Sequence, residues 1–255
     1  SGFVRSRGCG QIYFQPQRDL CCVVHGDDFT NLGSDSQLNW LRTQLSRLFE
    51  VKHRGRLGPG ADDQKSIRIL NRVVQWYPEG LWYEADQRHV DIIVRDLGLE
   101  EKSKQVSTPS VSPKVMDEEP LPAGQAVMYR VVVARAKYLA QDRVDIGYAV
   151  KELCRQMSTP SVHDWHQLKR LARYLKGTPR VVVKYMYQEK PKDITVWTDT
   201  DHAGCLRTRK STSGGVMMLG THCLKTWSVN QQHIALSSGE AEYYGLVRGA
   251  SQALG

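Results

Sequence analysis

The first hydrophobic pattern along the chain is that of two short strands. Leu20–Val24 is an unbroken apolar run rich in β-forming residues, and a strand-like pattern resumes at Phe29. The bend between them, Gly26-Asp27-Asp28, has turn chemistry, because glycine supplies positive φ and aspartate hydrogen-bonds to nearby backbone. The pattern therefore predicts two strands joined by a bend that holds two adjacent carboxylates. A solvated hairpin tip and a metal platform are the two interpretations of such a bend.

Helical spacing of apolar residues predicts two helices in the first half of the chain. One covers residues 35–50, and a shorter one ends at Gly98. Between them lies a loop rich in Gly, Pro and Asp. It is followed by an alternating stretch that predicts two strands turning at Pro78-Glu79-Gly80.

The second half of the chain has helices first, then strands, then one more helix. Residues 106–125 are rich in Pro, Ser and charge and are the best linker candidate. Two apolar stripes then predict a helical pair, the second helix capped by Ser161 with Asp164 and ending at Gly177. From Arg180 onward, successive β-rich runs precede a helix that opens at SSGEAEYY. This order indicates an α/β or α+β fold.

Composition points to a globular protein with a polyanionic partner. The chain has 255 residues, of which 40% are hydrophobic and 24% charged, enough for one large domain or two to three small ones. Its 35 Lys and Arg against 27 Asp and Glu give a net charge of +8 and a pI of about 9.2, which favours nucleic acid as partner. The six cysteines have neither C-x-x-C nor zinc-finger spacing, so free thiols are expected. The sequence has no initiator Met, no signal-peptide core and no membrane-spanning apolar run, and we expect a piece of a longer protein.

One predicted helix carries a cluster of basic residues beside its apolar stripe. The cluster consists of Lys169, Arg170, Arg173 and Lys176. A charged face of this kind is ordinarily just solvated, but its almost uniform positive charge favours contact with phosphates.

A second acidic constellation lies near the end of the sequence. Asp199 and Asp201 alternate along a strand and so share one face, and Asp201 is interpreted as a turn former. In the helix that follows, Ser237 and Glu240 have capping-box spacing, which gives Glu240 a structural role. Helical geometry does not choose between Glu240 and Glu242 as a metal ligand, whereas the capping argument favours Glu242. The apolar stripe of this helix lies between the two glutamates and consists of Tyr243, Leu246, Val247, Ala250 and Leu254.

Several longer motifs resemble a known family. The stretch WTDTDHAGCLRTRKSTSGGVMMLG…KTWSVNQQHIALSSGEAEYYGL resembles the ribonuclease H domain of copia-type retrotransposon polyproteins, with RKSTSGG, TWSVNQQ and ALSSGEAEY in matching order and spacing. Upstream, YRVVVARAKYLAQDRVDIGYAVKELCRQMSTPSVHDWHQLKRLARYLKGT is similar to the connection segment of that family. VVHGDDFT falls where the family has its reverse transcriptase Asp-Asp box. The resemblance covers nearly the whole chain.

The resemblance implies an α/β (α+β) fold with a fixed order of parts. Residues 1–105 would be the C-terminal part of the reverse transcriptase, with the end of the palm and the thumb, and 106–125 a linker. Residues 126–180 would be a helical connection, and 181–255 a ribonuclease H-like domain with a mixed sheet, truncated at its C-terminus. The family has further metal-binding aspartates outside this window, so we expect each active centre to be represented in part.

The resemblance also implies roles for four carboxylates. Asp27 and Asp28 match the paired metal ligands of the polymerase, although His25 stands where the family box usually has an aromatic residue. Asp199 and Glu242 match the first two ribonuclease H carboxylates. Clustered carboxylates hold two cations about 4 Å apart in two-metal phosphoryl transfer, and bound cations relieve the repulsion between like charges. The implied cofactor is Mg²⁺, with Mn²⁺ as an alternative.

The implied activities are RNA-directed DNA polymerase and RNA–DNA hybrid ribonuclease. The implied partners are an RNA template, a DNA primer, RNA–DNA hybrids and dNTPs, with no membrane. The implied location is intracellular, in cytoplasmic virus-like particles, with the nucleus as an alternative. The rival hypothesis is a catalytically dead or domesticated relic that acts only as a nucleic-acid-binding module. An unrelated basic RNA-binding module is a third, weaker hypothesis.

Overall fold

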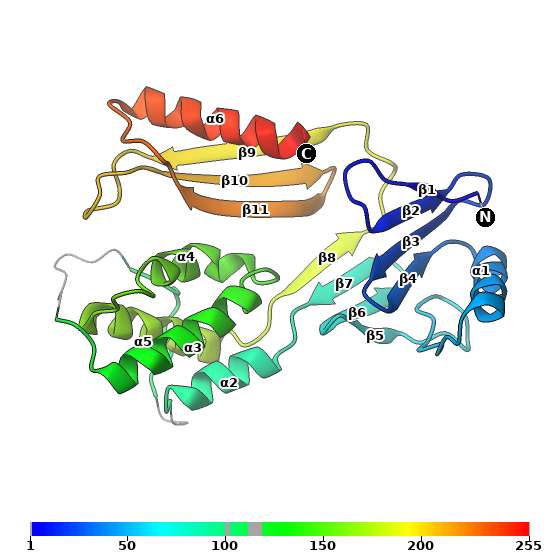
Figure 1. Ribbon diagram of the computed structural model, residues 1–255, viewed down its shortest axis with the longest axis horizontal. Coiled ribbons are helices and arrows are strands. Elements are labelled where there is room, and N and C mark those ends of the chain that lie inside the picture. Colours follow the sequence, from blue (N-terminus) through cyan, green and yellow to red (C-terminus); the bar gives the residue numbers. More distant parts are fainter. Residues whose placement is uncertain (1, 100–102, 112–118, 255) are drawn as a thin grey trace. The chain divides into compact units, whose positions relative to one another are not determined.

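The computed structural model describes residues 2–99, 103–111 and 119–254. They form two compact units, of which the first ends at Gln64 and the second runs from Lys65 to Leu254. Figure 1 labels the helices and strands of both units.

The first unit is a four-stranded antiparallel sheet with one helix. The sheet has the order β1-β2-β3-β4, with strands β1 (Val4–Arg5), β2 (Ile12–Gln15), β3 (Leu20–His25) and β4 (Asp28–Leu32). Helix α1 (Asp35–Leu48) confirms the helix predicted from the leucine spacing. Leu20 of β3 and Leu41 of α1 are both buried and belong to the core of this unit.

The second unit begins with another four-stranded antiparallel sheet. Its order is β5-β6-β7-β8, with strands β5 (Ser66–Ile69), β6 (Arg72–Tyr77), β7 (Gly80–Glu84) and β8 (Val182–Met186). The predicted hairpin at Pro78-Glu79-Gly80 is confirmed, but the predicted pair of strands is in fact three. The extra turn lies at Leu70 and Asn71, which both have positive φ. Leucine rarely adopts this conformation, and the sequence therefore carried no clear turn pattern there.

A helical core follows in the same unit. It contains α2 (Arg88–Asp96), α3 (Ala123–Leu139), the short helix η1 (Val144–Ile146), α4 (Gly147–Arg155) and α5 (Val162–Gly177). The stops at Gly98 and Gly177 and the two apolar stripes are confirmed, and Ser161 and Asp164 form a reciprocal capping box. Periodicity did not predict α3, because its Val131–Val133 run has the β-branched side chains typical of strands. Tyr129 and Val132 of α3 are nevertheless fully buried in this core.

The last part is a three-stranded sheet covered on one face by a helix. The sheet has the order β11-β10-β9, with strands β9 (Ile194–Asp201), β10 (Thr212–Leu219) and β11 (His222–Asn230). Helix α6 (Ser238–Leu254) runs along it (Figure 1). The expected α+β class is confirmed, but the expected mixed sheet is not, because every pairing between the strands named here is antiparallel.

Helix α6 packs in a way that its apolar stripe did not indicate. The buried residues are small, namely Ala241, Gly245 and Gly249. The larger apolar residues Tyr243 and Leu246 are 63% and 61% exposed. Small residues let the helix approach the sheet closely, and the packed face is the one lined by alanine and glycine, not the one with the large apolar residues.

Three further expectations concern the linker, the cysteine thiols and membrane-spanning helices. The linker interval is described at 106–111 and 119–125, and residues 112–118 lie outside the described part of the chain. All six cysteines are free, as expected. Among the described residues, no helix combines the length and apolar character needed to cross a membrane.

Candidate functional site

The two adjacent aspartates lie at a tight hairpin. His25 pairs with Asp28, so β3 and β4 are joined by the two-residue turn Gly26-Asp27. Gly26 has φ +59°, whereas Asp27 has no positive φ, which is the pattern of a type II′ hairpin turn. Asp27 therefore sits at the tip and Asp28 opens β4, and both side chains are exposed. The hairpin thus places two exposed carboxylates on adjacent residues at its tip.

A basic side chain approaches this pair from the loop after α1. Nη2 of Arg54 lies 3.4 Å from Oδ1 of Asp28. Arg56, two residues further on, donates to Oδ1 of Asp35 at 3.1 Å and to Oδ1 of Asn39 at 2.6 Å. The loop is thus tied to α1 immediately beside Arg54.

The strand β9 presents its alternate residues to opposite faces of the sheet. A Cβ atom added at Gly245 would lie 2.5 Å from Cγ2 of Thr200, and one added at Gly249 would lie 2.5 Å from Cγ2 of Thr198. Thr198 and Thr200 therefore face α6, and Asp199 between them projects from the other face, where it is exposed. Asp201 shares the face of Asp199, as expected, and accepts a hydrogen bond from the backbone N–H of Thr212. This bond supports the structural role predicted for Asp201.

Glu240 is committed to the start of α6. Oγ of Ser237 accepts a hydrogen bond from the backbone N–H of Glu240 at 3.1 Å, as the capping-box spacing predicts. The return bond differs from the prediction, because Oε2 of Glu240 accepts from the N–H of Leu236, at 2.7 Å, and not from that of Ser237. Oε1 accepts from the hydroxyl of Tyr244 at 3.0 Å. The bonds from Leu236 and Tyr244 lower the pKa of Glu240 below its ordinary value.

Glu242 remains without such a commitment. Its side chain is exposed, and within the described part of the chain no hydrogen bond or ion pair reaches it. It follows the buried Ala241 and so lies at the flank of the packed face of α6. Asp199, however, leaves the sheet on the face away from α6. The structure packs the two elements together but does not pair these two carboxylates.

The acidic residues offer oxygen ligands, the type that divalent cations such as Mg²⁺ prefer, but each group contains few of them. Among the described residues there is no group of three or more His, Cys, Asp or Glu side chains that could hold a metal ion. Mg²⁺ prefers oxygen ligands and is often held by only one or two carboxylates, with water and substrate phosphates completing its shell. The exposed carboxylates of Asp27 and Asp28 match that type and number of donors, whereas Asp199 and Glu242 are single carboxylates on separate elements.

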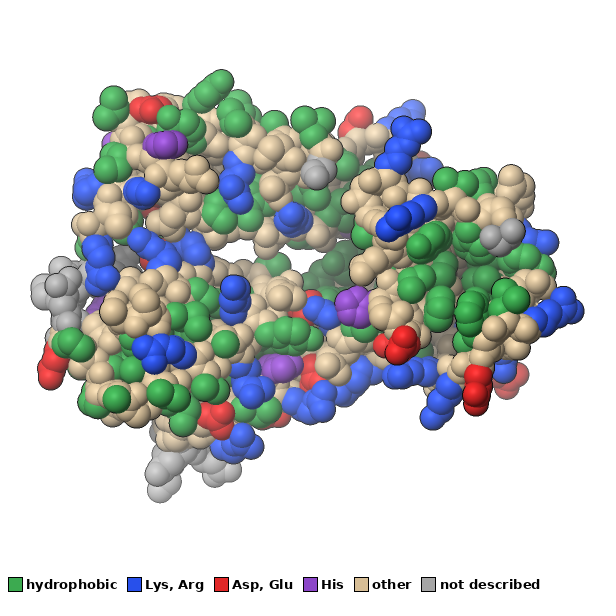
Figure 2. All heavy atoms as spheres, viewed as in Figure 1, with side chains coloured by type: hydrophobic (Ala, Val, Ile, Leu, Met, Phe, Trp, Pro, Cys, Tyr) green, Lys and Arg blue, Asp and Glu red, His purple; other side chains and the backbone are tan. Residues whose placement is uncertain are grey.

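The basic residues of α5 are partly covered. Nη2 of Arg170 donates to Oγ1 of Thr108 at 2.7 Å, and Nζ of Lys176 donates to the carbonyl of Ser103 at 3.4 Å. Lys169 lies over the ring of Trp165, 5.6 Å from its centroid. The side chains of Lys169, Arg170, Arg173 and Lys176 are half-buried, so a phosphate would reach only part of each. Basic side chains are instead spread over the visible face in Figure 2, with acidic ones interspersed among them.

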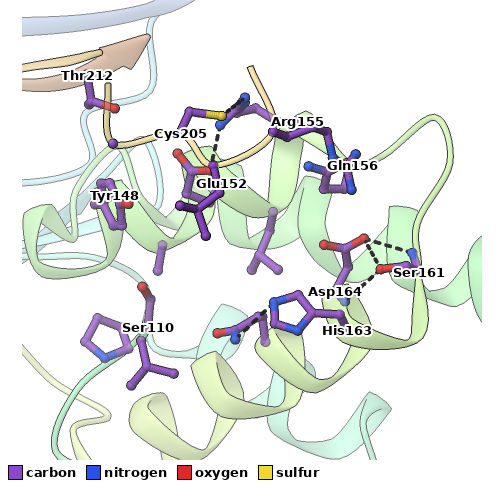
Figure 3. Close-up of a pocket in the computed structure, with 18 of the residues that line it drawn as sticks. Ser110, Tyr148, Glu152, Arg155, Gln156, Ser161, His163, Asp164, Cys205 and Thr212 are labelled. Atoms are coloured by element: carbon purple, nitrogen blue, oxygen red, sulfur yellow. Dashed lines mark hydrogen bonds and ion pairs between the residues drawn. The ribbon is translucent and has the colours of Figure 1, made fainter. Parts of the chain in front are cut away.

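Sequence reasoning missed a cavity of about 300 Å³ in the second unit. Figure 3 shows Arg155 and Glu152 of α4 on one side of it and Cys205, from the loop after β9, beside them. Nη2 of Arg155 donates to Sγ of Cys205 at 3.1 Å. Burial raises the pKa of Cys205, but hydrogen bonds from Thr208 and Arg155 outweigh it and lower that pKa to about 7. The sequence held no sign of this thiol, because Arg155 is distant from Cys205 along the chain.

Comparison with known proteins identifies the family to which this chain belongs. No protein-family model and no solved structure matches the chain. It is 31% identical over 236 residues to the uncharacterized mitochondrial protein AtMg00810 of Arabidopsis thaliana, covering 90% of this chain and 91% of that protein. It is 30% identical over 252 residues to the retrovirus-related Pol polyprotein from transposon RE2 of the same plant, covering 98% of this chain and 16% of the polyprotein. The corresponding polyprotein from transposon TNT 1-94 of Nicotiana tabacum is 26% identical over 241 residues.

These relatives define the class as retrotransposon polyproteins and confirm the resemblance found in the sequence motifs. The chain belongs to the copia-type retrotransposon Pol polyprotein family. It spans 16% of the length of the RE2 polyprotein, and so corresponds to one part of such a protein.

Proposed function

We propose that this chain supplies part of a reverse transcriptase centre and part of a ribonuclease H centre to a copia-type Pol polyprotein. The observation that carries the proposal is the two-residue β3–β4 hairpin, which presents two exposed carboxylates on a rigid scaffold. The net charge of +8 supports nucleic acid as the partner. The proposed substrates are an RNA template with a DNA primer and dNTPs at the first centre, and an RNA–DNA hybrid at the second, inside the cell.

In this proposal each carboxylate has a stated role. Asp27 and Asp28 hold Mg²⁺, or Mn²⁺, beside the primer terminus, and Asp199 and Glu242 contribute ligands to the nuclease centre. The metal, when bound, supplies electrostatic stabilisation of the attacking and leaving oxygens of phosphoryl transfer. Glu240 is excluded from this role, because its carboxylate already accepts two hydrogen bonds at the start of α6.

The test of the polymerase assignment is a chimera. This chain replaces the matched part of the RE2 polyprotein. Primer extension in Mg²⁺ is then measured for the chimera and for its Asp27→Asn and Asp28→Asn variants. Extension should be abolished in both variants while template binding is retained, because the carboxylates hold metal and not the nucleic-acid backbone. Extension at the parent rate in either variant would refute the assignment.

A second candidate function is nucleic-acid binding without catalysis. The position of Asp199 on the face away from α6 favours it, because a nuclease centre needs its carboxylates on one side. The intact chain would then bind an RNA–DNA hybrid equally well in Mg²⁺ and in EDTA. Neutralising Lys169 and Arg173 of α5 should flatten the salt dependence of binding by up to about two units of slope. An unchanged slope would make α5 an ordinary solvated face.

A further inference from the structure

The carboxylate of Asp28 already has a cation beside it. Nη2 of Arg54 lies 3.4 Å from Oδ1 of Asp28, with the two side chains 74% and 49% exposed. Within the described residues of the first unit, no ion pair reaches Asp27. The two members of the acidic pair thus differ in their surroundings, although they are adjacent in the sequence.

The position of Arg54 follows from how its loop is anchored. Arg56 is tied to Asp35 and Asn39 of α1, and its carbonyl accepts a hydrogen bond from the N–H of Gln64 at 2.8 Å. These bonds hold the loop from both sides only two residues beyond Arg54. The anchored segment keeps the guanidinium of Arg54 within reach of the hairpin tip, although the side chain itself is exposed.

We propose that Arg54 is a built-in counter-cation of Asp28 and competes with the divalent metal for that carboxylate. This inference rests on the proposed metal-holding role of Asp27 and Asp28. A metal on Oδ1 takes the oxygen that Arg54 contacts, and a metal on Oδ2 repels the guanidinium, so in this proposal metal binding drives Arg54 away from Asp28. Exposed ion pairs contribute little, and the competition should weaken apparent metal affinity by about twofold to fivefold.

The proposal sets a simple order of events at the hairpin. At low metal concentration Arg54 neutralises part of the charge of the Asp27–Asp28 pair. At saturating metal the Arg54 guanidinium is released, and its five N–H donors become available to another anion, such as a phosphate group. In this proposal Arg54 is a cation at the hairpin tip that opposes metal binding at low metal concentration.

The test is a Mn²⁺ titration of the whole chain at low ionic strength, followed by the electron paramagnetic resonance signal of free Mn²⁺. Arg54→Gln should tighten binding by about twofold to fivefold. Arg54→Lys, which keeps the charge, should stay near wild type. The difference should shrink at 0.5 M salt, because salt screens exposed charges.

A matched control removes the same charge elsewhere. Arg95 is 73% exposed and pairs with Asp96 in the second unit, so Arg95→Gln accounts for the general effect of net charge. Asp27→Asn and Asp28→Asn define the site. If neither changes Mn²⁺ binding, the proposed metal site fails, and this inference fails with it. If both abolish binding but Arg54→Gln binds no tighter than Arg95→Gln, the competition is refuted and the metal site stands.

Discussion

The two acidic pairs of this chain are positioned by different means. Asp27 and Asp28 are neighbours in the sequence, and one hairpin turn places both. Asp199 and Glu242 lie on a strand and a helix, and their side chains meet only if the packing of the two elements turns them toward each other. The structure turns Asp199 away from α6. Local chemistry therefore places the first pair, whereas tertiary packing decides the second.

Glycine has a different task in each region. Gly26 is required for its backbone conformation, since φ is +59° and an added Cβ would meet nothing within 4 Å. Gly245 and Gly249 are required for space, since an added Cβ would overlap a threonine of β9 in each case. The comparison can thus be tested by replacing these glycines with alanine in each region.

The largest effect is expected where α6 packs on the sheet. The double variant Gly245→Ala with Gly249→Ala should lower the free energy of unfolding by roughly 2–3 kcal/mol, because both methyl groups press on β9. The gain in helix propensity offsets part of the strain. Chemical denaturation followed by far-UV circular dichroism measures the loss.

A rescue separates this overlap from other causes. Adding Thr198→Ser and Thr200→Ser removes the two Cγ2 atoms that the new methyl groups would meet, and it should restore much of the stability. Gly239→Ala is the matched control, because its Cβ would meet only Oγ of Ser237, at 3.9 Å. A destabilised Gly239→Ala, or no rescue, would contradict the proposed packing of α6 and with it the face assigned to Asp199.

A smaller loss is expected at the hairpin. Gly26→Ala should cost about 1 kcal/mol, because alanine is strained at positive φ, while no side chain has to move. Gly26→Asn should cost less, since asparagine tolerates this conformation. The same denaturation experiment applies. Equal losses for Ala and Asn would mean that contact, and not backbone strain, governs this turn.

Much of the fold could be predicted from local patterns. The β3–β4 hairpin, α1, the stop of α2 at Gly98 and the cap of α5 all follow from residues within one or two turns of each other. Helix α3 could not, because its valine run has the composition of a strand. The turn that separates β5 from β6 could not be predicted either, since Leu70 gives no sign of a turn.

In the candidate site, too, local features were predictable from the sequence and tertiary contacts were not. The exposed tip at Asp27 and Asp28 was predictable from the sequence. The packed face of α6 was not, because its large apolar residues suggest one face and its glycines occupy the other. The contact of Arg155 with Cys205 was not predictable either, since it joins segments far apart in the chain. Spacing along the sequence determines neighbours on one element, but it does not determine which faces meet.

The cysteine thiols should differ in reactivity, with Cys205 the most reactive of those whose pKa is shifted. Cys205 should react with iodoacetamide about threefold faster at pH 7 than a model thiol of ordinary pKa, because half of it is thiolate at that pH while its nucleophilicity is lower. Its rate should rise with pH to a midpoint near 7 and level off above pH 8. Mass spectrometry of the alkylated peptides gives the rate for each cysteine.

Two controls accompany this measurement. Burial raises the pKa of Cys22 in the first unit and of Cys154 in the second, so both should react slowly at pH 7. Arg155→Gln removes one donor to Sγ of Cys205, and its midpoint should move to higher pH. A midpoint that stays near 7 in Arg155→Gln would mean that Thr208 alone lowers the pKa of this thiol.

The smallest expected effect distinguishes the two glutamates of α6. Hydrogen bonds from Leu236 and Tyr244 lower the pKa of Glu240 below its ordinary value of 4.5. A depressed pKa in the folded state means that ionised Glu240 stabilises the fold, in full above pH 4.5 and progressively less as the pH falls through the folded value. Glu240→Gln should therefore lower the melting temperature slightly at pH 6, and this difference should shrink toward pH 3.

Glu242→Gln is the matched control for that measurement. It makes the same change two residues away, on a side chain that no described residue contacts through a hydrogen bond or ion pair. Its melting temperature should equal that of the wild type at both pH values. In a Tyr244→Phe background, the effect of Glu240→Gln should shrink further, because one of the two bonds to the carboxylate is already absent. A pH-dependent loss in Glu242→Gln and none in Glu240→Gln would reverse the two roles. Glu240 would then be the residue free to hold a metal, and the hairpin would be the only acidic pair whose placement the sequence predicts.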